Sequence, residues 1–168
     1  MEGEIVNRVS KSPLVTLDLE ECYPKGERFG IDLSQWLEEG FILREKEFRD
    51  ALKGHDWEAY RDAYVYLHCS TDAIVPAWAY MLIGSHLHQI AREAVVGPRE
   101  LMETVIFRKR LESLDLETYR DRPVIIKGCS NLPVPPSAYV WALQRIQEVA
   151  RSVMYGEACS AVPLFKKK

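Results

Sequence analysis

The stretch that decides the fold reads Tyr64-Val65-Tyr66-Leu67-His68-Cys69-Ser70-Thr71-Asp72-Ala73-Ile74-Val75-Pro76-Ala77-Trp78-Ala79-Tyr80. It begins with apolar, aromatic and β-branched residues, which predict a buried strand. Pro76 favours the first turn of a helix, and the apolar residues after it predict a helix over residues 76–91 that lies deep in the core. The stretch therefore predicts a strand, a Cys-Ser loop and a helix in succession.

The same pattern occurs a second time. Residues 123–126 predict a strand, which leads into Lys127-Gly128-Cys129-Ser130, and residues 137–155 predict a long helix that ends at Gly156. Both stretches read Cys-Ser, a short spacer, and then Val-Pro-x-x-Ala-Tyr. A third, shorter copy reads Cys159-Ser160-Ala161-Val162-Pro163, so three of the four cysteines share a Cys-Ser…Val-Pro context.

The repeat indicates where the thiols lie. If the two strands are parallel neighbours, Cys69 and Cys129 lie at one edge of the sheet and face helix N-termini, whose free N–H groups stabilise a thiolate. Cys159 follows the second long helix and can return to the same edge. Ligands of α/β sheets bind at that edge, so we expect the three thiols to converge there.

Convergent thiolates are typical of a zinc site or an iron–sulfur cluster, with a fourth ligand from histidine or a carboxylate. The nearest candidates for that ligand are His68, Asp72 and Glu157. No Cys-x-x-Cys pair is present. The sequence therefore predicts a site assembled from distant segments, which binds metal or carries sulfur on Cys69, Cys129 and Cys159.

The rest of the chain completes an α/β pattern. Further predicted elements are strands at residues 14–19, 29–33 and 162–165, and helices at residues 45–53 and 99–114. We expect a single domain over residues 1–168, with one small mixed sheet, two strand–Cys-Ser–helix units and long apolar helices. An α+β arrangement is the alternative.

Composition excludes several classes of protein. The chain has 168 residues, of which 47% are hydrophobic, and a formal net charge of −3. This excludes a disordered chain and argues against nucleic acid as a partner, which requires basic charge. No apolar run reaches the roughly 20 residues of a membrane helix, and the acidic start has no signal region. We therefore expect a cytoplasmic protein that does not bind membranes.

Two other functions fit the same residues. In the first, the cysteines are buried and inert, and the aromatic helices form the face of a homodimer in a non-enzymatic interaction module. In the second, Cys129 or Cys69 is the nucleophile of a small-molecule enzyme, with His68 as the base.

One resemblance covers nearly the whole chain and is carried by Gly40-Phe41-Ile42-Leu43-Arg44-Glu45-Lys46-Glu47-Phe48-Arg49, residues 72–82, residues 127–130 and residues 156–163. In these stretches the chain resembles the bacterial domain-of-unknown-function family 2480. It implies no established activity, but through the family's gene neighbourhood it implies iron–sulfur assembly proteins as partners. Two short stretches are also similar to cysteine sites of U-type iron–sulfur scaffold and sulfur-acceptor proteins: Leu67-His68-Cys69-Ser70 and Lys127-Gly128-Cys129-Ser130.

Overall fold

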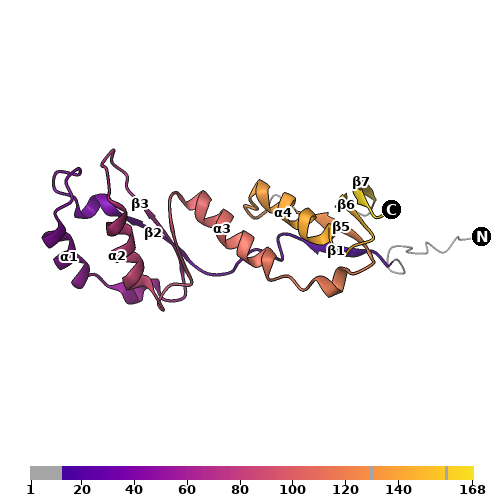
Figure 1. Cartoon of the computed structure of the whole chain (residues 1–168), viewed down its shortest axis with the longest axis horizontal. Coiled ribbons are helices and arrows are strands. Elements are labelled where there is room, and N and C mark those ends of the chain that lie inside the picture. The colour runs from indigo at the N-terminus through magenta and orange to yellow at the C-terminus, as the bar shows by residue number, and fades with distance from the viewer. Residues whose placement is uncertain (1–12, 129–130, 158) are drawn as a thin grey trace, which may run out of the picture. The chain divides into compact units, whose positions relative to one another are not determined.

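The computed structural model describes residues 13–128, 131–157 and 159–168. The chain forms two compact units (Figure 1). The inner unit is residues 25–106, and the outer unit combines the residues up to 24 with residues 107–168. The inner unit is therefore inserted into the outer unit after its first strand. The prediction of a single domain over residues 1–168 stays a prediction.

The inner unit is built on a parallel sheet of three strands in the order β2-β3-β4. Its α-helix α2 packs against this sheet and buries Ala79, Ile83 and Leu87, which recur at helical spacing. In chain order its elements are β2 (Arg28–Asp32), η1 (Leu33–Trp36), α1 (Glu45–Lys53), η2 (Trp57–Tyr60), β3 (Tyr64–His68), α2 (Ala77–Leu87) and β4 (Glu93–Val96). Helix α3 (Arg99–Glu112) follows and continues into the outer unit.

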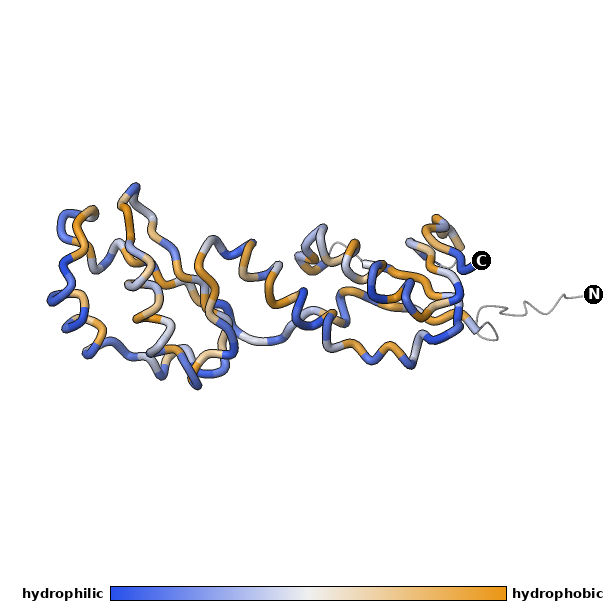
Figure 2. The backbone as a smooth tube through the Cα atoms, viewed as in Figure 1, coloured by the Kyte–Doolittle hydropathy of each residue, from blue (hydrophilic) through white to orange (hydrophobic). Residues whose placement is uncertain are grey.

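The outer unit has a sheet of four strands in the order β1-β5-β6-β7. The first three strands are parallel, and β7 returns antiparallel to β6. Figure 2 shows β5 as largely hydrophobic and α1 as largely hydrophilic. The elements are β1 (Val15–Asp18), the end of α3, η3 (Leu116–Tyr119), β5 (Pro123–Lys127), α4 (Pro136–Gln147), β6 (Ser152–Glu157) and β7 (Ser160–Lys166).

The two units repeat one another in detail. Each has a central strand, β3 or β5, preceded by a 3-10 turn and an aspartate in the left-handed region, Asp62 (φ 58°) or Asp121 (φ 53°). The backbone N–H of each aspartate donates to the segment after the helix, to Ile90 and Val149 respectively, at 2.9 Å in both cases. The Cys-Ser repeat of the sequence therefore belongs to a duplicated strand–strand–helix–strand unit.

The α/β class is confirmed, but the strands divide into two sheets. The predicted strands at residues 64–67 and 123–126 are consequently not neighbours, because each is the central strand of its own sheet. Two long helices are present where they are predicted, at residues 76–91 and 137–155, but their predicted C-terminal ends are wrong. They end at Leu87 and Gln147, and the residues after them form β4 and β6.

Tertiary pairing explains both errors. Residues 152–155, which the sequence assigns to a helix, pair in parallel with the central strand β5 instead. Residues 93–96 lie just after the other predicted helix and pair with β3, so α2 ends early enough for the chain to reach that strand. Helix α2 also buries only one face, since Met81 on its other side is 73% exposed. The prediction that α2 lies deep in the core is therefore wrong for that side.

Candidate functional site

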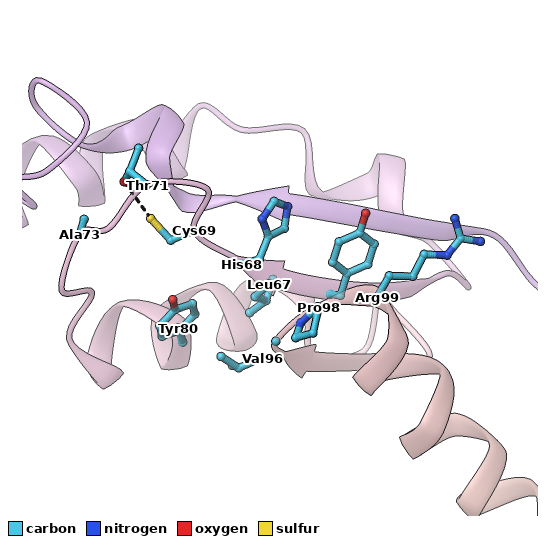
Figure 3. Close-up of a pocket in the computed structure, with 11 residues that line it drawn as sticks. Leu67, His68, Cys69, Thr71, Ala73, Tyr80, Val96, Pro98 and Arg99 are labelled. Atoms are coloured by element: carbon cyan, nitrogen blue, oxygen red, sulfur yellow. Dashed lines mark hydrogen bonds between the residues drawn. The ribbon is translucent and has the colours of Figure 1, made fainter. Parts of the chain in front are cut away.

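An open cavity of about 660 Å³ lies in the inner unit, at the carboxyl ends of β3 and β4 (Figure 3). Parallel strands end at a common edge, and ligands of α/β proteins bind at that edge. The cavity is lined by residues from β3, the loop after it, α2 and the β4–α3 connection: Tyr66, Leu67, His68, Cys69, Thr71, Ala73, Tyr80, Val96, Gly97, Pro98 and Arg99.

Gly97 shapes one wall of this cavity. Its N–H donates to the carbonyl of Leu67 at 2.9 Å, which extends the pairing of β4 with β3. Its φ of 139° allows the chain to turn directly into α3, and a Cβ at this position would come within 2.7 Å of Leu101 Cδ2. The positive φ is the reason that glycine is needed here, since the side chain of Leu101 is flexible and could move aside.

Cys69 is held by its neighbour Thr71. The Sγ of Cys69 lies 3.3 Å from Thr71 Oγ1 (Figure 3). The same hydroxyl donates to the carbonyl of Gly40 at 2.6 Å. A threonine hydroxyl has a single hydrogen, and here that hydrogen is used on Gly40. The thiol of Cys69 is therefore the donor to Thr71.

Asp32 holds the loop that carries Cys69. It ends β2 next to His68 in register, and its Oδ1 accepts the backbone N–H groups of Ser34 and Ser70 at 3.0 Å each. The hydroxyls of Ser34 and Ser70 also lie 3.0 Å apart. Burial opposes ionisation of Asp32, but the hydrogen bonds from Ser70 and Ser34 outweigh it and hold the pKa of this carboxyl well below its usual range. An ionised Asp32 thus ties the Cys69-Ser70 loop to the neighbouring strand.

Three rings contribute polar groups to the cavity. Tyr66 and His68 are two residues apart on β3 and therefore share a face, and their rings stack with centroids 5.4 Å apart. Burial raises the pKa of Tyr80, and charge on Cys69 raises it further, so the phenol stays protonated at neutral pH. Within the described residues, the side chains of Tyr66, His68 and Tyr80 make no hydrogen bond, so they are available to a ligand.

Arg99 supplies positive charge to the cavity. Its Nε lies 3.7 Å from Glu103 Oε1, but Glu103 already receives two hydrogen bonds from Arg28, at 3.0 and 3.2 Å. The side chains of Arg28 and Glu103 are each 8% exposed, whereas that of Arg99 is 55% exposed. Glu103 is thus mainly the partner of Arg28, and the guanidinium of Arg99 remains accessible.

Two of the six predicted site residues, Cys69 and His68, line this cavity. They follow one another at the end of β3, and the hydrogen-bond partner of the thiol is Thr71 rather than His68. Asp72 is exposed and is not among the residues that line the cavity.

The other predicted residues belong to the outer unit. Cys159 is exposed just before β7, and Glu157 ends β6 opposite Ser160. Cys129 lies outside the described residues. The strands that lead to Cys129 and Cys159, β5 and β6, are parallel neighbours and end at the same edge of their sheet.

Among the described residues, no three or more histidine, cysteine, aspartate or glutamate side chains form a group that could hold a metal ion. The site shared by Cys69, Cys129 and Cys159 stays a prediction. Cys22, the fourth cysteine, is 5% exposed in the core of the outer unit, where burial raises the pKa of its thiol.

Sequence reasoning missed Asp32, Thr71, Tyr80 and Arg99 as parts of the site. For Asp32 a signal was present, because Asp18-Leu19 and Asp32-Leu33 end the first strand of each unit in the same way. For Thr71 and Arg99 the partners are set by the tertiary fold, and the sequence contains no comparable signal.

Comparison with known proteins identifies the family. Residues 3–167 match the family described as protein of unknown function (DUF2480), and the chain belongs to it. No curated protein and no solved structure matches the chain. Among the described residues, no helix has the length and apolar character needed to span a membrane.

Proposed function

We propose that this member of a family of unknown function binds a small molecule in the inner-unit cavity, with Cys69 as the group that reacts with it. The observation that carries the proposal is the cavity itself. It lies at the carboxyl edge of a parallel sheet and brings a thiol together with polar side chains. A largely apolar pocket with a few convergent polar groups is the usual form of a ligand site.

The chemistry follows from the lining. A cysteine thiol is the most nucleophilic side chain near neutral pH, and it becomes reactive once it loses its proton. Tyr66, His68 and Tyr80 offer hydrogen bonds that can orient a bound molecule. No base is assigned to the Cys69 thiol, because its hydrogen-bond partner is the hydroxyl of Thr71.

The test combines alkylation with binding. Ligand-observed NMR against a panel of small carboxylates, phosphates and amides should give binders, and alkylation of Cys69 by N-ethylmaleimide, verified by peptide mapping, should abolish their binding. Cys159→Ser is the matched control, because it removes an exposed thiol of the other unit and should leave binding intact. Binding that persists after complete alkylation of Cys69 would contradict the proposal.

We infer a second candidate function, metal binding, from the threefold Cys-Ser repeat. In it a zinc ion or an iron–sulfur cluster is bound jointly by Cys69, Cys129 and Cys159. The common edge at which β5 and β6 end favours it for the latter two cysteines. Its partners would be iron–sulfur assembly proteins, and its compartment the cytoplasm. Elemental analysis and an absorption spectrum of anaerobically purified protein test it. Stoichiometric metal that disappears in each Cys→Ser variant supports this function, and full metal content in all three variants excludes it.

A further inference from the structure

The inner-unit cavity is lined without acidic residues, although the protein as a whole is acidic. The chain has 25 acidic and 22 basic residues, yet none of the residues that line the cavity is acidic. The lining does include Arg99, which is always charged, and His68. Charge complementarity between a site and its ligand therefore favours an anion.

The charge of Arg99 is accessible to such an anion. Its carboxylate neighbour Glu103 is 8% exposed and is held in a two-bond ion pair by Arg28. The 3.7 Å separation between Arg99 Nε and Glu103 Oε1 is longer than a hydrogen bond. A ligand carboxylate or phosphate can thus accept hydrogen bonds from the guanidinium of Arg99 without disrupting the buried ion pair between Arg28 and Glu103.

The two ends of the cavity differ. Figure 3 shows Arg99 at one end and Cys69 with Tyr80 toward the other, with His68, Leu67 and Val96 between them. The end at Cys69 also includes Ala73 and has no carboxylate, guanidinium or ammonium group in its lining. A ligand that fills the cavity therefore has an anionic end and an uncharged end.

We propose that the cavity takes a small organic anion, whose carboxylate or phosphate pairs with Arg99 and whose uncharged end lies at Cys69. This inference rests on the proposed function, since it names the ligand class of the same site. Arg99 acts by binding the anionic group, and it sets specificity without touching the thiol.

The test uses two maleimides that react with the same thiol. N-ethylmaleimide is uncharged, and maleimidohexanoate carries a carboxylate on a flexible chain. In each reaction the sulfur forms a bond to one alkene carbon, and the neighbouring carbon gains a proton. Peptide mapping by mass spectrometry gives the rate at each cysteine. The measured quantity is the rate with maleimidohexanoate divided by the rate with N-ethylmaleimide, and the exposed Cys159 of the same molecule is the reference.

At low ionic strength we expect this ratio to be about tenfold higher at Cys69 than at Cys159, as one charge-assisted hydrogen bond would give. Arg99→Gln should reduce the ratio at Cys69 to that of Cys159, and because the ratio compares two reagents at one thiol, a change in the reactivity of the thiol itself does not enter it. Arg99→Lys should retain part of the preference, and added salt should weaken it.

Arg61→Gln is the matched control. The side chain of Arg61 is also 55% exposed and pairs with a glutamate on its own segment, and it lies before β3 rather than after it. This variant changes the net charge equally and should keep the full ratio. Equal ratios at Cys69 and Cys159 in the wild-type protein would overturn the anion proposal and leave the proposed function standing. No reaction of Cys69 with either maleimide would overturn both.

Discussion

The thiol of Cys69 donates a hydrogen bond to Thr71, across 3.3 Å, because the only hydrogen of the Thr71 hydroxyl is donated to Gly40 at 2.6 Å. This bond occupies the S–H group of Cys69. Anything that removes Thr71 as an acceptor, or releases it from Gly40, should make Cys69 more reactive.

Thr71→Val tests this relationship. Valine has the shape of threonine without the acceptor, so alkylation of Cys69 by iodoacetamide at neutral pH should become about three- to tenfold faster. Thr71→Ser keeps the hydroxyl and should react as the wild type does. A slower reaction in Thr71→Val would mean that the hydroxyl donates to the sulfur, contrary to this assignment.

Asp32→Ala should destabilise the protein by about 1–3 kcal/mol, because it leaves the backbone N–H groups of Ser34 and Ser70 without their acceptor. Urea denaturation at neutral pH measures the change. The matched control is Asp72→Ala on the same loop, an exposed aspartate whose loss should change stability little. Equal stability of the two variants would contradict the role of Asp32.

The same carboxyl makes stability depend on pH in the acid range. The pKa of Asp32 is lowered by folding, so its contribution is fully present above the unfolded value near 3.8 and is lost as the pH falls through the folded value. Urea midpoints of the wild type should therefore fall more steeply below about pH 4 than those of Asp32→Ala. Parallel curves would contradict the assignment.

Gly30→Ala should be destabilising, by about 1 kcal/mol or more. A Cβ on Gly30 would come within 2.5 Å of the Tyr66 ring, so the ring must leave its stacked position on His68. Gly84→Ala is the control, because a Cβ there meets nothing within 4 Å and alanine favours the helix. Thermal denaturation should show opposite signs for the two variants.

His55 should make the inner unit sensitive to mild acid. Burial lowers the pKa of His55, the neighbouring Asp56 partly opposes this, and His86 adds to the lowering. The stabilising contribution of neutral His55 is present above the unfolded pKa near 6.5 and is lost as the pH falls below it.

Between pH 7.5 and about 5.5, the wild type should therefore lose more stability than His55→Gln. His88→Gln, which alters an exposed histidine, should follow the wild-type curve. A wild type that gains stability over this interval would contradict the direction of the shift.

Much of the fold can be predicted from local sequence. The amphipathic helix at residues 45–53 and the strands β1, β3 and β5 have strong local patterns, and they occur where the patterns place them. The strands β4 and β6 cannot be found this way, because the segments before them, residues 88–92 and 148–151, contain no glycine or proline to end the helix patterns. The chain instead changes direction at Gln89, which has a φ of 64°.

The cysteine repeat indicates only the strand–loop–helix part of each duplicated unit. Glu58-Ala59-Tyr60-Arg61-Asp62 and Glu117-Thr118-Tyr119-Arg120-Asp121 share Glu-x-Tyr-Arg-Asp and precede the central strands. Together with the Asp-Leu pairs, this motif predicts two complete units. The cavity is less accessible to sequence reasoning, because Gly40, Thr71 and Arg99 contribute to it through the loops and strand pairing of the folded unit.

Because the inner unit is inserted into the outer unit, the two units can complete their folding only in a fixed order during synthesis. The inner unit is continuous in the chain, so it can fold as soon as residue 106 has left the ribosome. Strand β1 emerges before the inner unit, but its parallel partner is β5, so Val15 cannot pair with Val124 until the whole inner unit has been made. Strand β1 therefore waits for its partner during most of synthesis, and until then its edge is open to a chaperone or a neighbouring chain.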